Sequence, residues 1–178
     1  YTGEDTLSLH DALPIYLKMK LYEILDTKID IAFDNESSNF FNASTLIDNE
    51  HYGFDATLKP LTSVTNALYY SNNIKTKSNE LIKLETDDID VWVISFFNMG
   101  IGWLNYDLTG KGNSLKVLSF VNQALLQFVK QYHPKYIAFT ADSNTRVNVY
   151  TKIISKAIKI KNQYKFDADK TDLIVMKV

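Results

Sequence analysis

A long amphipathic helix pattern between two strand patterns constrains the fold of this chain most. Over 114–132, apolar residues recur at three- and four-residue spacings, which predicts a helix with one buried face. The flanking segments 89–98 and 136–141 are rich in β-branched and aromatic residues, as is typical of strands. The helix positions predicted to be buried are Val117, Leu118, Phe120, Val121, Ala124, Leu125, Phe128 and Tyr132.

The order of the other elements predicts one sheet with helical crossovers. Residues 101–108 predict a strand that returns antiparallel to 89–98, so Trp92 and Leu104 are expected on neighbouring strands. Strand 136–141 is expected to run parallel to 101–108, because a right-handed helical crossover joins them. The remaining C-terminal predictions are a helix over 144–158, faced by Val147, Tyr150, Ile154 and Ala157 or Ile158, and strands over 163–166 and 173–178.

The N-terminal half gives weaker signals. Residues 51–58 alternate at period two, which predicts a strand that ends at Pro60. Residues 28–33 indicate a weak strand, and the Asn- and Ser-rich segment 34–44 predicts a loop. The pattern over 61–70 leaves a helix and an extended segment equally open.

The first fifteen residues, YTGEDTLSLHDALPI, differ in character from the rest of the chain. They resemble translated sequencing-adapter DNA at the ends of reading frames from assembled metagenomes, although an amphipathic helix is the alternative. We therefore expect residues 1–18 to be a non-native segment and residues 19–178 to form one domain.

Composition excludes several classes of function. The chain has 178 residues and a net charge of −2, of which residues 1–15 carry three acidic and no basic side chains, so the rest is close to neutral. A neutral surface gives no footprint for nucleic acid, and no apolar run is long enough to span a membrane. Cysteine is absent, which excludes thiolate chemistry and favours the cytoplasm. His51 and His133 have no carboxylate at ligand spacing, so no metal site is expected.

A short glycine-bearing loop, 109–113, comes directly before the long helix. Backbone N–H groups at a helix N-terminus have no intrahelical partner, and glycines let an anion approach them closely. The spacings of a Walker A loop and of a Rossmann fingerprint are both absent, and a plain strand-to-helix turn is the alternative. The candidate anion-binding residues are Thr109, Gly110, Lys111, Gly112, Asn113 and Ser114.

The stretch 89–178 resembles the GNAT (Gcn5-related) family of acyl-CoA-dependent acyltransferases in its order of strand, glycine loop, long helix, strand, helix and two strands. It is also similar to uncharacterised bacteriophage proteins with a TGxGN loop and an RVxxY-like element, here 109–113 and 146–150. The resemblance implies an α/β (α+β) fold with a mixed, mostly antiparallel sheet flanked by helices. It also implies that the coenzyme enters a gap where the two crossover strands splay apart.

The resemblance assigns roles to particular residues. The family loop [QR]xxGx[GA] falls on 107–112, which implies that the amides of 111–114 hold the pyrophosphate of acetyl-CoA. Asp107 stands where the family has Gln or Arg, and Lys111 where it has an aliphatic residue. Tyr150 matches the tyrosine that protonates the departing thiolate, whereas periodicity alone favours a core tyrosine.

Two functions are expected on these grounds. The first is an N-acyltransferase that acetylates a small-molecule or peptide amine, with Asp90, Asp107 and Glu85 as candidates for the general base. The second is a non-catalytic GNAT-like binding protein of phage origin that acts on a host factor in the host cytoplasm. Asp107 favours the second, as does an N-terminal half without the two helices that the family carries after its first strand. The motifs leave the acceptor and the oligomeric state open.

Overall fold

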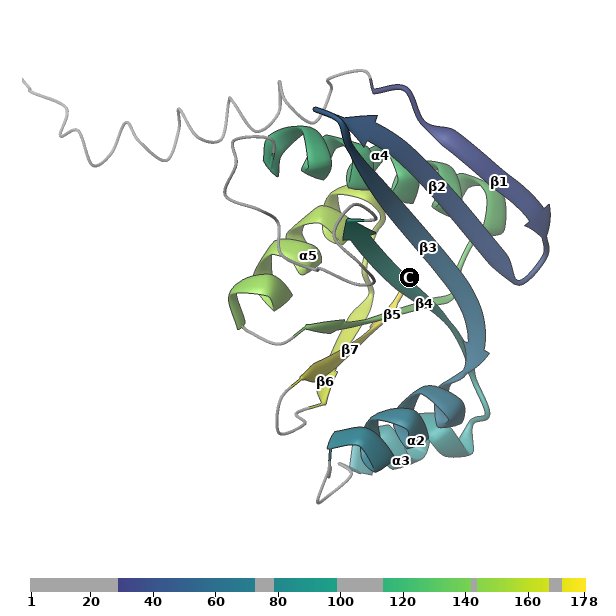
Figure 1. Cartoon of the computed structure of the whole chain (residues 1–178). Coiled ribbons are helices and arrows are strands. Elements are labelled where there is room, and N and C mark those ends of the chain that lie inside the picture. Colours follow the sequence, from purple (N-terminus) through teal and green to yellow (C-terminus); the bar gives the residue numbers. More distant parts are fainter. Residues whose placement is uncertain (1–28, 73–78, 99–113, 142–143, 167–170) are drawn as a thin grey trace, which may run out of the picture.

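The computed structural model describes residues 29–72, 79–98, 114–141, 144–166 and 171–178 as a mixed α+β fold (Figure 1). Within these residues, seven strands form one sheet in the order β1-β2-β3-β4-β5-β7-β6, in which β4 and β5 are the one parallel pair. The strands are β1 (Ala32–Ser37), β2 (Phe40–Ile47), β3 (Glu50–Pro60), β4 (Asp90–Asn98), β5 (Tyr136–Ala141), β6 (Asn162–Phe166) and β7 (Asp172–Lys177). The helices in these residues are α2 (Leu61–Asn72), α3 (Asn79–Thr86), α4 (Ser114–Tyr132) and α5 (Asn144–Ala157).

The first three strands form an antiparallel meander, so the predicted loop over 34–44 is wrong. Most of that segment belongs to β1 and β2, and only Ser38 and Asn39 connect them. Asn and Ser are tolerated here because alternate β2 residues are buried and supply the stabilising contacts. The β2–β3 connection is also two residues long, and Asp48 and Asn49 have φ of 50° and 67°, as in the tight turns that match strand twist.

Two helices connect β3 to β4. Residues 61–72 form α2, which settles the choice left open over 61–70, and β3 ends at Pro60 as predicted. The short helix α3 was not predicted, because its buried residues are only Leu81 and Leu84. The hydroxyl of Thr65 on α2 donates a hydrogen bond to Glu85 on α3, which joins the two helices.

The C-terminal half agrees closely with the sequence prediction, apart from the hairpin. The observed α4, β5, α5, β6 and β7 lie where helices and strands were expected. β5 is parallel to a strand before the crossover helix, but that strand is β4. At Trp92 both edges of β4 are occupied, by Leu58 on β3 and Ile137 on β5. The expected pairing of Trp92 with Leu104 is therefore wrong at that position, and 101–108 lies outside the described residues.

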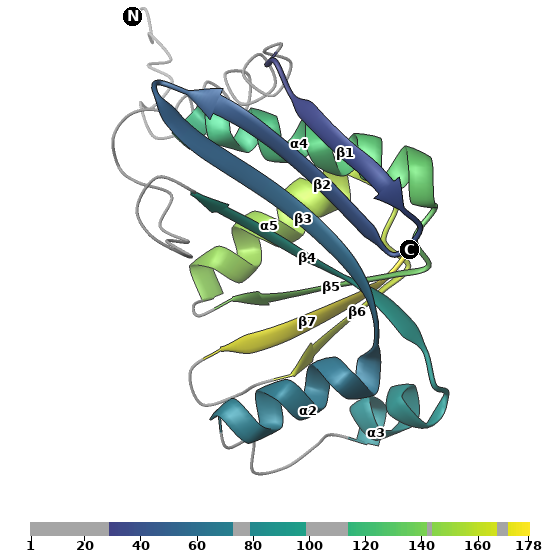
Figure 2. The same ribbon diagram turned by 45° about the vertical axis from the view of Figure 1, so that its right-hand side comes forward.

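Helices cover the two faces of the sheet unequally. α4 and α5 lie on one face, while α2 and α3 lie on the other, near the strands of the C-terminal half (Figures 1 and 2). We call the latter the second face; it is the face opposite α4 and α5. In Figure 2 the second face of β1–β3 is not covered by any of the described helices.

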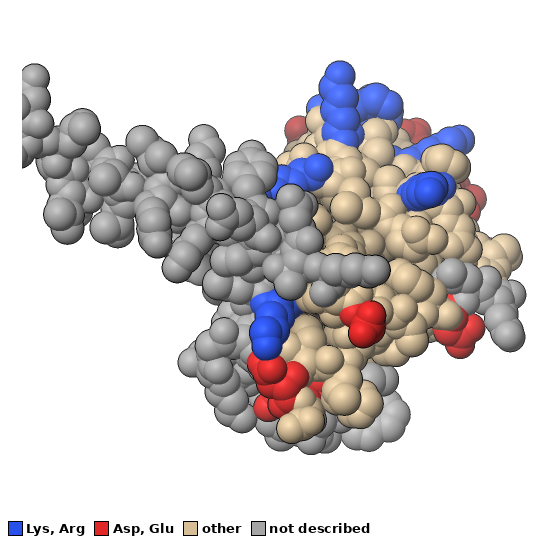
Figure 3. Space-filling view, turned by 90° about the horizontal axis from the view of Figure 1, so that it is seen from above, with Lys and Arg blue, Asp and Glu red and all other residues tan. Residues whose placement is uncertain are grey.

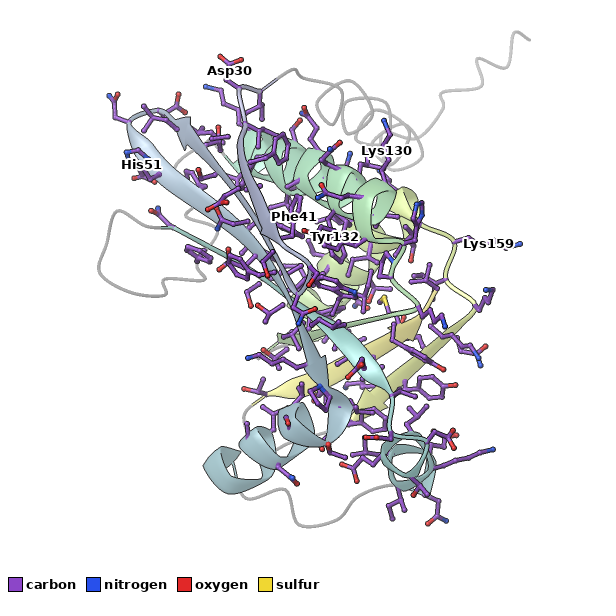
Figure 4. The ribbon with its side chains drawn as sticks, turned by 90° about the vertical axis from the view of Figure 1, so that its right-hand side faces the viewer. Asp30, Phe41, His51, Lys130, Tyr132 and Lys159 are labelled. Carbon is purple, nitrogen blue, oxygen red and sulfur yellow. The ribbon has the colours of Figure 1, made fainter. Side chains whose placement is uncertain are left out.

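An aromatic cluster joins α4 to the meander. Phe128 of α4 is fully buried and lies 5.6 Å from Phe41 and 5.0 Å from Trp92, between ring centroids. Figure 4 labels Phe41 and Tyr132, whose rings are 6.0 Å apart. The Tyr132 hydroxyl donates to the carbonyl oxygen of Ser37 at 2.9 Å, which ties the end of α4 to the β1–β2 turn. The predicted buried face of α4 is confirmed at six positions, whereas Leu118 and Tyr132 are partly buried.

On the face seen in Figure 3, most of the Lys side chains lie in the upper half of the view, while the acidic side chains lie mainly lower down and at its edges. In the described part of the chain, no helix combines the length and apolar character needed to cross a membrane.

Candidate functional site

The parallel strands β4 and β5 pair over only part of their length. The Cα partners are Trp92 with Ile137 and Val93 with Ala138. Beyond this pair β4 continues to Asn98 and β5 to Ala141, and the two strands diverge (Figure 2). The sheet is therefore open between the C-terminal ends of its two central parallel strands, where α/β proteins often bind ligands.

A cavity of about 220 Å³ occupies this opening. Pockets for drug-sized ligands measure about 300–1,000 Å³, so this one suits the end of a chain-like ligand better than a whole nucleotide. Its wall is mainly apolar, with Ser95, Thr140 and Thr171 among the hydroxyl-bearing residues. The lining residues are Ile94, Ser95 and Phe96 of β4, Phe139, Thr140 and Ala141 of β5, Val121 and Leu125 of α4, Tyr150, Ile153 and Ile154 of α5, and Phe54 and Thr171.

Tyr150 lines the cavity and is also part of the core. Its side chain is 7% exposed, and its ring meets Phe96 and Phe139 edge-on at centroid distances of 4.6 and 5.7 Å. Edge-to-face pairs at such distances are favourable beyond their buried area. The core role that periodicity favoured is therefore confirmed, and the same packing fixes the ring at the wall of the gap.

The helix that comes after the glycine loop contributes to the same site. α4 begins at Ser114, as predicted, and its residues Val121 and Leu125 reach the cavity wall. Of the predicted anion-binding residues, Thr109, Gly110, Lys111, Gly112 and Asn113 lie outside the described residues, as does Asp107. Their assignment stays a prediction.

A row of polar residues crosses the second face of the sheet next to the cavity. Asn42, Asp55 and Ser95 are direct cross-strand neighbours on β2, β3 and β4. The Nδ2 group of Asn42 donates a short hydrogen bond to Oδ1 of Asp55. Ser95 also lines the cavity, so the row connects Asp55 to the opening.

Partial burial raises the pKa of the Asp55 carboxyl above its ordinary value of 3.8, while the hydrogen bond from Asn42 acts in the opposite direction. No basic side chain among the described residues forms an ion pair with this carboxylate. A carboxyl group that is desolvated beside a cavity and not neutralised is a candidate functional group.

Because the pKa of Asp55 is raised, its ionised carboxylate destabilises the folded state once the pH is high enough to remove the proton. The folded state binds the Asp55 proton more tightly than the unfolded state does. The stabilisation that the protonated group gives is therefore fully present below pH 3.8, and it is lost as the pH rises through the folded-state pKa. Replacing Asp55 with asparagine keeps an oxygen acceptor for Asn42 and removes the charge. We expect Asp55→Asn to be more stable than the parent chain at neutral pH and equally stable at pH values well below 3.8.

Urea unfolding followed by circular dichroism at both pH values tests this expectation. Asp90→Asn is the matched control, because Asp90 is exposed at the start of β4 and its change should have a small effect. A loss of stability in Asp55→Asn at neutral pH would contradict the assignment of a desolvated carboxylate.

The other candidates for a general base lie elsewhere or are not described. Asp90 is exposed opposite Pro60, and Glu85 accepts the Thr65 hydrogen bond on α3; neither lines the cavity. Sequence reasoning missed Asp55, although a signal was present. The apolar residues of this strand alternate and lie on one face: Tyr52, Phe54, Ala56 and Leu58. The alternation places Asp55 in mid-strand on the opposite face, and aspartate is depleted in strands.

Metal chemistry has no candidate site in the described residues. No group of three or more His, Asp or Glu side chains in that part of the chain could hold an ion. His133 is exposed directly after α4, with φ of 46°, as expected for a helix-end residue before Pro134.

Comparison with known protein families finds no family that matches this chain, and comparison with curated proteins finds no significant match.

Proposed function

We propose that this chain is a GNAT-type N-acyltransferase that uses acetyl-CoA to acetylate an amine. The observation that carries the proposal is the end of β4–β5 pairing after Val93 and Ala138, with a cavity in the opening. The family that the sequence resembles admits its coenzyme between splayed crossover strands. The cavity's size and apolar wall fit the acyl end of such a coenzyme.

The start of α4 suits the phosphate end of the same ligand. A helix N-terminus attracts anions through its free N–H groups and its dipole, and α4 is 19 residues long. The resemblance assigns this role to residues 109–114. Val121 and Leu125, further along α4, line the cavity, so a ligand running along the helix from its N-terminus would end there.

Tyr150 supplies a weak acid at the cavity wall. Acetyl-CoA supplies an acyl thioester, and its cleavage by an amine releases a thiolate. In this proposal the Tyr150 hydroxyl donates a proton to that sulfur, while the packing of its ring on Phe96 and Phe139 holds it in place.

A non-catalytic GNAT-like binding protein is the second candidate. The two helices that the family carries after its first strand help to shape the acceptor site. In the part of the chain that the structure describes, the first strand, β1, is joined to β2 by a two-residue turn, and the two helices α2 and α3 come after β3 instead. This difference in position favours an acceptor, or a binding partner, unlike those of the family.

Calorimetric titration of acetyl-CoA into the full chain tests the proposal. Thr140 is exposed on β5 and lines the cavity, so Thr140→Trp should narrow the opening without changing the core. We expect the parent chain to bind acetyl-CoA and Thr140→Trp to bind it at least about tenfold more weakly, which corresponds to about 1.4 kcal/mol. Gly112→Asp should weaken binding as well, because a carboxylate at the loop repels phosphate.

Gln163→Trp is the matched control, since Gln163 is an exposed strand residue that does not line the cavity. It should bind acetyl-CoA like the parent chain. If the parent chain gives neither heat nor a thermal shift with acetyl-CoA, the acyltransferase proposal is wrong and the non-catalytic candidate takes its place.

A further inference from the structure

The second face of β3 presents an anionic group beside an aromatic ring. Asp55 and Gly53 lie on this face, because the alternate residues Phe54 and Ala56 belong to the core on the α4 side. Gly53 is opposite Phe97 in the β3–β4 register. A Cβ atom at Gly53 would lie 2.6 Å from Cε2 and Cζ of Phe97. The Phe97 ring therefore extends over β3 into the space that Gly53 leaves, and Asp55 is the next residue along β3 on the same face.

This arrangement has a definite ligand preference. A partly buried carboxylate without a basic partner gains most from a cation, and an aromatic ring attracts a cation through its electron-rich face. Asn42 occupies one carboxylate oxygen and leaves acceptor capacity for further donors. A primary ammonium group offers three donors and a compact positive charge, which match both neighbours.

The position of Asp55 in the sheet relates it to the cavity. Asp55 is the direct cross-strand partner of Ser95, and Ser95 lines the opening between β4 and β5. Side chains opposite each other on neighbouring strands are about 4.5–5.5 Å apart at Cβ. A group held at Asp55 would thus lie at the edge of the opening, on the face of the sheet opposite α4.

We propose that the Asp55–Phe97 pair binds the ammonium group of a primary alkylamine, which makes this face the acceptor side of the site. The role of this pair in catalysis rests on the proposed acyl transfer, but the binding of the ammonium group does not require the coenzyme. The raised pKa of Asp55 supports it further, because an ammonium ion would compensate the burial of the charged carboxylate. Asp55 can then accept the proton that the ammonium must lose before the nitrogen attacks the thioester carbon.

Nuclear magnetic resonance titration of the 178-residue chain with n-butylammonium chloride tests the proposal, with n-butanol as the neutral probe of similar shape. We expect saturable shifts of the backbone amides of Asn42, Asp55 and Ser95 with the ammonium and none with the alcohol. Asp55→Asn should weaken the affinity by about tenfold, the size expected for a lost hydrogen bond to a charged group. Phe97→Leu should weaken it by about threefold.

Asp90→Asn, which changes an exposed carboxylate on the same sheet, should leave the affinity unchanged. The proposal is overturned if the shifts are absent, if butanol reproduces them, or if Asp55→Asn keeps the parent affinity. Because acetyl-CoA is not part of this experiment, the two proposals fail separately. Ammonium binding without acetyl-CoA binding would leave the cation site in place and remove acyl transfer.

Discussion

Replacing Phe128 with alanine is expected to lower the free energy of unfolding by about 3–5 kcal/mol, the usual range for a fully buried phenylalanine. Phe128 has no exposed surface, and its ring contacts Phe41, Trp92 and Tyr132. The substitution removes the central ring of the cluster that joins α4 to the meander, and the rigid strands can close the resulting cavity only partly. Guanidinium denaturation followed by circular dichroism measures the change.

Leu126 is the matched control on the same helix. Its side chain is 44% exposed, so Leu126→Ala should change the free energy of unfolding by less than about 0.5 kcal/mol. Both substitutions place alanine in the middle of α4, so they differ in helix propensity only by tenths of a kcal/mol. A loss below about 1 kcal/mol in Phe128→Ala would contradict the packing of α4 against β2 and β4.

In the proposed acyl transfer, with Tyr150 as the general acid, Tyr150→Phe is expected to lower kcat by about 10²-fold or more. The phenylalanine ring keeps the edge-on contacts with Phe96 and Phe139, so the fold and the affinity for acetyl-CoA should change little. The pH profile of kcat should also lose its basic limb, because that limb reports the group that donates the proton. Steady-state kinetics with an amine acceptor and calorimetric titration of acetyl-CoA separate the two effects.

Tyr164→Phe is the control for this prediction. Tyr164 lies on the edge strand β6, where its hydroxyl accepts a hydrogen bond from Asn162, and it does not line the cavity. Loss of the Tyr164 hydroxyl should leave kcat unchanged. If Tyr150→Phe also keeps the parent kcat and pH profile, Tyr150 serves the core alone, and the proton must come from another group or from water.

The C-terminal half was predictable because its signals are local. The apolar spacing of α4 extends over five turns, and Pro134 ends the helix, so few alternatives remained. The assignment of Tyr150 to the site came from the resemblance to GNAT proteins, whereas periodicity alone favoured a core tyrosine. Loop residues 109–113 lie outside the described residues, so that part of the predicted site is still a prediction.

The N-terminal half was harder to predict because its strands depend on their neighbours. Asn42 and Ser44 are poor strand formers in isolation, yet both lie in β2, where Phe41 and Ala43 are fully buried against the helical layer. Asp48-Asn49 was an available turn signal, since both residue types tolerate the positive φ that this hairpin requires. Composition alone predicted a loop over 34–44, but contacts with neighbouring strands stabilise most of this segment as parts of β1 and β2.

The sequence by itself determined the order of the C-terminal elements and the buried face of α4, because each depends on residue spacing within one segment. Tertiary structure alone decided which strand takes part in the crossover, since 89–98 and 101–108 both have strand patterns. It also decided that β4 and β5 separate after Val93 and Ala138. The tertiary structure alone also forms the row of Asn42, Asp55 and Ser95, because cross-strand register brings together residues that are distant in the sequence.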